Sequence, residues 1–249
     1  MPSCNARGHF AMNNTKYLLY CPKMIKQYLE TYLYYFSPVF AAIAFFASLT
    51  IWFFPVGAQR FLKVLSLFLL VDLAAETISA YQAKHIINNL FFGNFVTMLQ
   101  FSFYLYLVRE IIRRPKARKV LLYCLIIYPA IFIVNVMLVQ GSGVFHSMTY
   151  ALGCLLIVVS CVYYFFELFQ QAYSVNLGRQ PGFWICSGLL FFYTCTFPLY
   201  GATNLLNRLP KVILLNLLFI LVLLNILLYL SFTIAFLCRL KTRNSMSSY

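Results

Sequence analysis

Seven apolar stretches, each near or above the roughly 20 residues that a membrane-spanning helix needs, occupy most of this chain. Inside a bilayer the backbone N–H and C=O groups must find partners within the chain, so such stretches fold as helices. Proline and glycine separate them, as expected where helices end. The sequence therefore predicts an all-α polytopic membrane protein, a seven-transmembrane-helix bundle. The predicted spans are Leu33–Phe54, Phe61–Tyr81, Ile86–Val108, Val120–Gln140, Phe145–Leu168, Phe183–Asn204 and Val212–Cys238.

The composition supports this class. Hydrophobic residues make up 63% of the 249 residues and charged residues 10%, with a mean hydropathy of +0.82, whereas about 25% of the residues in a soluble domain are charged. We expect residues 1–31 to form an extramembrane segment, with Met24 as an alternative start, residues 32–239 to form the seven-helix domain, and residues 240–249 to form a short cytoplasmic tail.

The basic residues predict the orientation. The formal net charge is +14, from 19 basic and five acidic residues. No folded basic domain lies outside the spans, so we do not predict nucleic-acid binding and attribute the charge to the positive-inside rule. One side of the predicted topology collects 12 basic residues and the other seven, which places the carboxyl terminus in the cytoplasm and the amino terminus outside, in a bacterial inner membrane. Four basic residues of the amino-terminal segment argue the other way.

The densest run of charge lies between the third and fourth spans. We predict that it fixes the topology and contacts anionic lipid. An alternative is that it docks a cytoplasmic signalling partner. Its basic residues are Arg109, Arg113, Arg114, Lys116, Arg118 and Lys119.

Asp72 and Glu76 are the acidic residues that most need an explanation. They lie one helical turn apart, deep in an otherwise apolar span. A carboxylate near the centre of a bilayer costs at least about 2.5 to 3.5 kcal/mol on insertion scales, so it normally faces protein or a water-filled cavity and marks a functional site. No Lys or Arg lies at the same depth. The pair predicts a proton-sensing switch or proton-coupled transport.

Polar residues of other spans fall at overlapping depths. Together with the acid pair they predict an outward-facing pocket, between the second, third, sixth and seventh helices, that binds a small molecule or a proton. The alternative is that the Asn and Thr residues only hold the helices together through hydrogen bonds. The predicted pocket residues are Asp72, Glu76, Asn89, Asn94, Thr196, Tyr200, Asn216 and Asn225.

Several other kinds of chemistry lack the residues they need. The three histidines are separated, the eight cysteines form no CxxC pair, and no HExxH motif or glycine-rich phosphate loop occurs. The last span contains no Lys to form a Schiff base. We therefore predict no metal site, no cofactor and no catalytic residues, and the sequence does not favour an enzyme.

Three segments carry a resemblance to a known group. They are Leu67–Glu76, the aromatic run Phe101–Leu107, and Pro181–Tyr193, with spaced Asn residues in Asn216–Cys238. In these the chain resembles an uncharacterised seven-transmembrane-helix family of Bacteroidota, whose module resembles a membrane sensor or receptor region associated with histidine kinases. The resemblance implies a sensor whose signal passes to a separate partner, since no kinase domain follows residue 239.

The function expected from the sequence is therefore a membrane sensor or receptor. A small proton-coupled transporter is one alternative, and a structural or assembly subunit without a pocket is another. Helices broken near their middle would favour the transporter, and a closed interior would favour the structural subunit.

Overall fold

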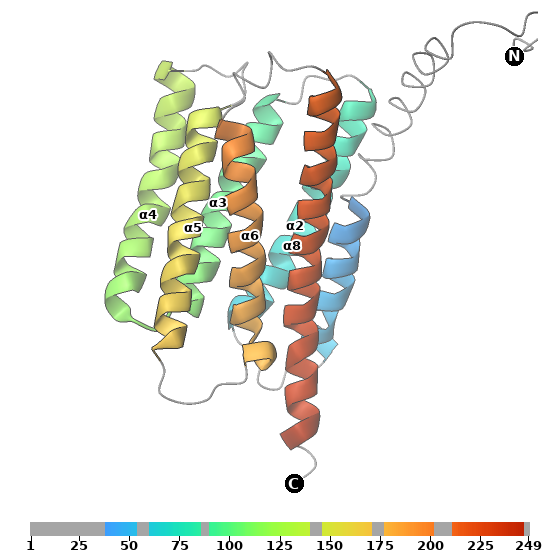
Figure 1. Cartoon of the computed structure of the whole chain (residues 1–249), viewed down its shortest axis with the longest axis vertical. Coiled ribbons are helices and arrows are strands. Elements are labelled where there is room, and N and C mark those ends of the chain that lie inside the picture. Colours follow the sequence, from blue (N-terminus) through green and yellow to red (C-terminus); the bar gives the residue numbers. More distant parts are fainter. Residues whose placement is uncertain are drawn as a thin grey trace, which may run out of the picture.

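Long helices run side by side along the molecule (Figure 1). The structure is a computed structural model of the whole chain, and it describes residues 38–53, 60–85, 90–139, 146–170, 177–201 and 211–246. All of these residues lie in helices or in short connections next to them. The all-α prediction is confirmed for this part of the chain.

The described helices follow the predicted order. The first is Pro38–Phe53. It is followed by α2 (Arg60–Lys84), α3 (Leu90–Ile111), α4 (Pro115–Val134) with a π-helical turn η1 (Asn135–Val139), α5 (Ser147–Phe169), a 3₁₀ turn η2 (Leu177–Arg179), α6 (Pro181–Gly201) and α8 (Lys211–Met246).

Among the described residues, five helices are long and apolar enough to cross a bilayer, so the chain is an integral membrane protein. They are Leu90–Ile111, Pro115–Leu138, Ser147–Phe169, Pro181–Leu199 and Phe219–Cys238, and they correspond to five of the seven predicted spans. The first predicted span corresponds to helix Pro38–Phe53, which is apolar but shorter, and its residues 33–37 lie outside the described part. The second corresponds to α2, which carries the acid pair. The count of seven spans stays a prediction.

Proline sets the start of two helices at one end of the bundle. Pro115 is the first residue of α4, and Pro181 is the first residue of α6. Proline suits this position because the first N–H groups of a helix have no partner within it. Both helices begin a few residues before the apolar stretch from which they were predicted.

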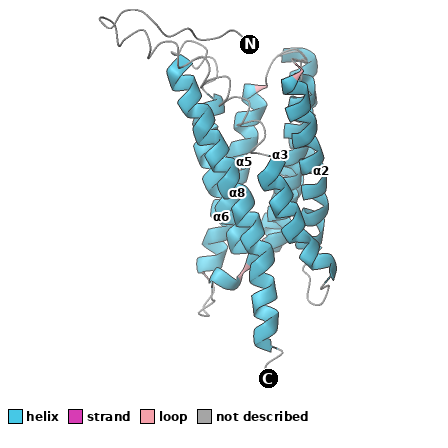
Figure 2. Ribbon diagram, turned by 90° about the vertical axis from the view of Figure 1, so that its right-hand side faces the viewer, coloured by secondary structure: helices cyan, strands magenta, loops and turns pink. Residues whose placement is uncertain are grey.

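Helix α8 is longer than predicted. It continues past Cys238 to Met246, so the predicted tail begins as a continuation of this helix. Its 36 residues correspond to about 54 Å, against a hydrocarbon core of about 30 Å. Figure 2 shows its carboxyl-terminal end extending beyond the other helices.

Aromatic rings fill the centre of the bundle. The Phe101 ring of α3 is surrounded by the rings of Tyr128, Tyr150 and Tyr193, with centroids 5.7, 5.2 and 5.1 Å away. The backbone of α5 comes close to this ring, because a Cβ built on Gly153 would lie 2.7 Å from it. Glycine at this position lets α3 and α5 approach each other, as small residues do in membrane bundles.

A small polar contact joins the first described helix to α2. The Ser48 and Ser66 hydroxyls lie 2.8 Å apart, and the indole N–H of Trp52 donates to the Ser66 oxygen at 3.2 Å. Both serines are buried, so this contact is shielded from solvent and fixes helix Pro38–Phe53 on the side of α2.

Candidate functional site

The Asp72 carboxylate ties three helices together. It projects from α2 and is almost fully buried. The Gln100 side-chain N–H of α3 donates to Oδ1 at 2.7 Å, and the Tyr229 hydroxyl of α8 donates to Oδ2 at 2.8 Å. Each carboxylate oxygen therefore has its own donor from a different helix. This arrangement satisfies a buried carboxylate without a cation.

Glu76 belongs to the same interface. It lies one turn along α2 and is half-buried. Its carboxylate is close enough to Tyr104 of α3 and Tyr229 of α8 to act electrostatically on both hydroxyls. We call the five residues Asp72, Glu76, Gln100, Tyr104 and Tyr229 the Asp72 cluster. The acid pair thus turns toward α3 and α8 and not toward the lipid.

The cluster lies near the middle of its three helices. Asp72 is near the middle of α2, Gln100 is near the middle of α3, and Tyr229 is near the middle of the apolar window Phe219–Cys238 of α8. The position of Asp72 near the bilayer centre stays a prediction.

Two of the predicted pocket residues lie in polar contacts elsewhere in the bundle. Asn94 is buried on α3, but its side-chain oxygen accepts the backbone N–H of His146 at 3.3 Å. The reason is depth, because Asn94 is six residues before Gln100, which is about 9 Å along the helix axis. Thr196 is also buried, but on α6, where its hydroxyl lies beside the Cys154 thiol of α5.

Of the remaining predicted pocket residues, the structure describes the side chain of one and not those of the others. Asn225 is half-buried on α8, one turn before Tyr229 and on the same side of the helix. Asn89 lies outside the described residues, as do the side chains of Tyr200 and Asn216. The predicted outward-facing pocket therefore stays a prediction, and the part that the structure describes is the Asp72 cluster.

His146 organises a second polar cluster, which the sequence did not predict. It precedes α5 and is buried. Its ring Nδ1 lies 2.9 Å from the amide nitrogen of Asn135 in the π-helical turn, and its ring packs edge-on against Phe132 at 5.5 Å. Burial lowers the pKa of His146, so the neutral ring is favoured. With Asn94, this cluster joins α3, α4 and α5.

The basic loop is ordered around two glutamates. Glu110 forms ion pairs with Arg109 at 2.7 Å and Arg118 at 3.0 Å. Arg114 donates to the side-chain oxygen of Gln170 at the end of α5. The other members of the predicted basic loop, Arg113, Lys116 and Lys119, are exposed.

Glu167 lies at the end of α5 that faces the basic residues Arg113 and Arg114. It is buried at the end of α5, and its carboxylate accepts the backbone N–H of Arg113 at 3.2 Å and that of Arg114 at 3.0 Å. These N–H groups come directly before Pro115, where α4 begins. Glu167 therefore caps the amino-terminal end of α4 from another helix.

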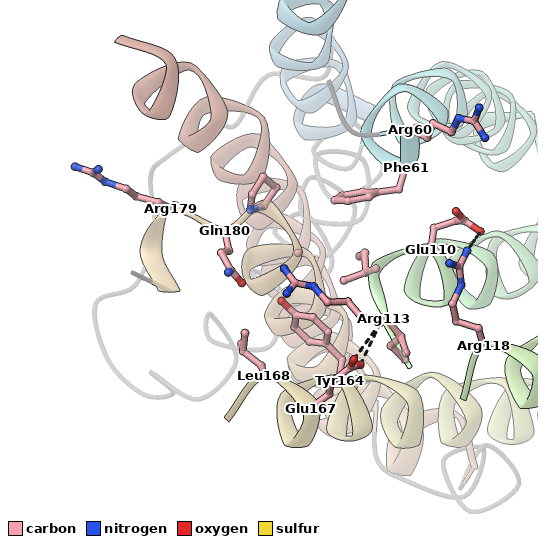
Figure 3. Close-up of a pocket in the computed structure, with 14 residues that line it drawn as sticks. Arg60, Phe61, Glu110, Arg113, Arg118, Tyr164, Glu167, Leu168, Arg179 and Gln180 are labelled. Carbon is pink, nitrogen blue, oxygen red and sulfur yellow. Dashed lines mark hydrogen bonds and ion pairs between the residues drawn. The ribbon is translucent and has the colours of Figure 1, made fainter. Parts of the chain in front are cut away.

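A cavity of about 640 Å³ opens at this same end of the bundle (Figure 3). It lies where α3 ends and α4 begins, and it is also bounded by the ends of α2, α5 and α6. Arg60 and Arg179 line it together with residues of the basic loop. The topology predicted from the sequence already put these two arginines on the side of the loop, but it contained no signal that they share a cavity with it.

Neither a metal site nor a similarity to known proteins assigns a function to these residues. Among the residues that the structure describes, no group of three or more His, Cys, Asp or Glu side chains is placed to hold a metal ion. No protein-family model, curated protein or solved structure matches this chain. The resemblance to the Bacteroidota family therefore stays a prediction.

Proposed function

We propose that this protein is a membrane sensor in which protonation of the Asp72 cluster changes how α8 packs against α2 and α3. The observation that carries the proposal is the Asp72 carboxylate, which is buried near the middle of α2 and hydrogen-bonded to one donor on each of two other helices. Burying such a group for structure alone is costly.

A proton is the stimulus that best suits this geometry. Neither the arginine-lined cavity nor a smaller one between α4 and α5 includes Asp72. A proton needs no cavity of its own. When the carboxylate is protonated, one of its oxygens becomes a donor, so the two bonds from Gln100 and Tyr229 can no longer both be accepted in the same way.

Helix α8 is the element suited to carry the change from the Asp72 cluster to the end of the bundle. It supplies Tyr229 to the cluster and continues well beyond the bundle to Met246 (Figure 2). A small rotation or shift at Tyr229 is passed along a continuous helix to its carboxyl-terminal end. We propose that a separate signalling partner reads that end together with the basic loop, on the cytoplasmic side of a bacterial inner membrane with the amino terminus outside.

The geometry favours a sensor over the two alternatives. A transporter would be favoured by helices broken near their middle, but α2, α3 and α8 are continuous through the Asp72 cluster. The closed packing around Asp72 also suits a structural subunit, but such a subunit needs no carboxylate at this position. In that case a neutral side chain of the same shape would serve at least as well.

The test uses tryptophan fluorescence in lipid nanodiscs. The chain has two tryptophans, and Trp184→Phe leaves Trp52 as the single probe. The indole N–H of Trp52 donates a hydrogen bond to Ser66 of α2, and Ser66 lies six residues before Asp72 in that helix. We expect its emission to change with pH in the Asp72 protein, and to stay constant in Asp72→Asn, which keeps the shape of the side chain but cannot titrate.

Glu110→Gln is the matched control, since it removes a carboxyl group at the end of the bundle and should leave the transition in place. A transition that persists in Asp72→Asn, or its absence from the Asp72 protein, would contradict the proposal. Uptake of a solute driven by a proton gradient, lost in Asp72→Asn, would instead identify a transporter.

A further inference from the structure

The arginine-lined cavity is separate from the Asp72 cluster and has an unusual charge balance. Four arginines, Arg60, Arg113, Arg118 and Arg179, line it together with two glutamates, Glu110 and Glu167, so the lining carries a formal excess of two positive charges. Its volume of about 640 Å³ lies within the usual range of about 300 to 1,000 Å³ for small-molecule sites.

Both glutamates are already engaged. Glu167 accepts backbone N–H groups at the start of α4, and Glu110 is shared between Arg109 and Arg118. Arg60, Arg113 and Arg179 form no ion pair with any residue that the structure describes. Neither glutamate of the lining forms an ion pair with these three guanidinium groups, so the net positive charge of the cavity is available to an anion.

The side chains are arranged with one arginine in the cavity and two at its rim. In Figure 3 the Arg113 guanidinium points between the Gln180 amide and the Tyr164 ring, whereas Arg60 and Arg179 extend away from the centre. The Tyr164 side chain is buried. Arginine, tyrosine and glutamine can all donate hydrogen bonds to the same oxyanion.

The first turn of α6 adds to the positive electrostatic potential in the cavity. Pro181 and Gly182 line the cavity, so the positive end of the helix dipole is directed at it. A Cβ built on Gly182 would lie 3.1 Å from the Tyr164 hydroxyl oxygen and 2.9 Å from a methyl carbon of Ile111. Glycine is thus what allows the end of α6 to approach this wall of the cavity.

From these observations we infer that the cavity binds a phosphate group. Arg113 is its main ligand, Tyr164 and Gln180 are additional hydrogen-bond donors, and Arg60 and Arg179 add positive charge at the rim. A phosphate group reaches this end of the bundle either as the headgroup of an anionic phospholipid or as a soluble phosphate compound. The two sources share the same chemistry, and they are separated by experiment.

The experiment measures thermal stabilisation of the full chain, since a ligand that binds the folded state raises its melting temperature. One arm adds inorganic phosphate to protein in a neutral detergent. The other compares vesicles of phosphatidylcholine with vesicles that also contain phosphatidylglycerol. Stabilisation by phosphate in detergent indicates a soluble ligand, and stabilisation by phosphatidylglycerol alone indicates a lipid headgroup. No stabilisation in either arm would overturn the inference.

Arg113→Gln is the test variant, and it keeps the backbone N–H that binds Glu167. We expect it to weaken binding about tenfold or more, as for the loss of a charge-assisted hydrogen bond. The matched control is Lys119→Gln, which removes the same charge at the same end but from an exposed residue that does not line the cavity. Equal losses in the two variants would show that binding is only a general attraction to positive charge, and would overturn the inference.

Gln180→Glu provides a second test that does not depend on the folding of Arg113→Gln. The new carboxylate next to Arg113 should leave the ligand-free protein at least as stable while it abolishes phosphate binding. Retained binding in this variant would contradict the assigned site. Asp72→Asn should leave phosphate binding unchanged, so failure of this inference and failure of the proton-sensor proposal can be told apart.

Discussion

Replacing Glu167 tests whether one buried carboxylate organises the arginine end of the bundle. In the structure it accepts the backbone N–H groups of Arg113 and Arg114, which come directly before α4. Glu167→Ala leaves these two N–H groups without their partner. Glu167→Gln keeps the shape and one acceptor oxygen but loses the charge.

The expected cost follows from the two lost hydrogen bonds. A hydrogen bond to a charged group contributes about 1.5 to 3 kcal/mol, and loss of a helix cap costs about 0.5 to 2 kcal/mol. Arg113 and Arg114 are exposed, so water replaces part of what their N–H groups lose. We therefore expect Glu167→Ala to lower the free energy of unfolding by about 2 to 4 kcal/mol, and Glu167→Gln by about 1 kcal/mol.

The assay is denaturant unfolding in detergent micelles, together with hydrogen exchange at the two amides. Exchange at Arg113 and Arg114 should be faster in Glu167→Ala than in the unmodified protein. The control is Glu110→Gln at the same end, whose ion pairs are partly exposed and should contribute less than about 1 kcal/mol. The same unfolding free energy in Glu167→Ala and the unmodified protein, with unchanged exchange at both amides, would refute the capping role.

Three further predictions concern other parts of the bundle. In a double-mutant cycle, Tyr229→Phe should cost about 1 to 2 kcal/mol when Asp72 is present and close to nothing in Asp72→Ala, and equal costs would show that the bond does not stabilise the fold. Gly188→Ala should cost about 1 to 3 kcal/mol, because the new Cβ would lie 2.7 Å from Cβ of Ser231 on α8, and Ser231→Gly should restore part of the loss in the unfolding assay. Burial lowers the pKa of His146, so protonation of its ring favours the unfolded state. The contribution of the neutral ring to folding stability should be fully present above about pH 6.5, the ordinary pKa of His. The melting temperature should fall as the pH drops below that value. His146→Gln should flatten that pH dependence, and an unchanged slope would contradict this reasoning.

The helices themselves could be predicted from the sequence because their signals are local. An apolar run of about 20 residues can satisfy its backbone in a bilayer only as a helix, and Pro115 and Pro181 start helices through their own chemistry. The depth of Asp72 follows from its position in its helix. Helix α8 was predicted too short because its last turns are polar, and the apolar run gave no sign that the helix continues.

The partners of the polar side chains could not be predicted in the same way. In a span that is apolar on every side, no polar face shows which way the helix is rotated, so nothing in the sequence indicated that Gln100 would meet Asp72, and only Asn94 of α3 was among the predicted pocket residues. Tyr229 is one more aromatic residue in an apolar run, and only its spacing of four residues from Asn225 suggests a shared face. Whether Gln100 and Tyr229 contact Asp72 depends on the rotation and lateral packing of α2, α3 and α8.

The sequence by itself determined that the protein is a helical membrane protein, where its apolar helices lie in the chain, and that a carboxylate lies near the middle of one long helix. The tertiary structure decided which side chains surround that carboxylate, that Glu167 caps a neighbouring helix, and that arginines from three separate segments share one cavity. The physical reason is that helix formation in a bilayer depends on residues close together in the chain, whereas these sites are formed by helix ends and faces that meet only after the bundle has packed.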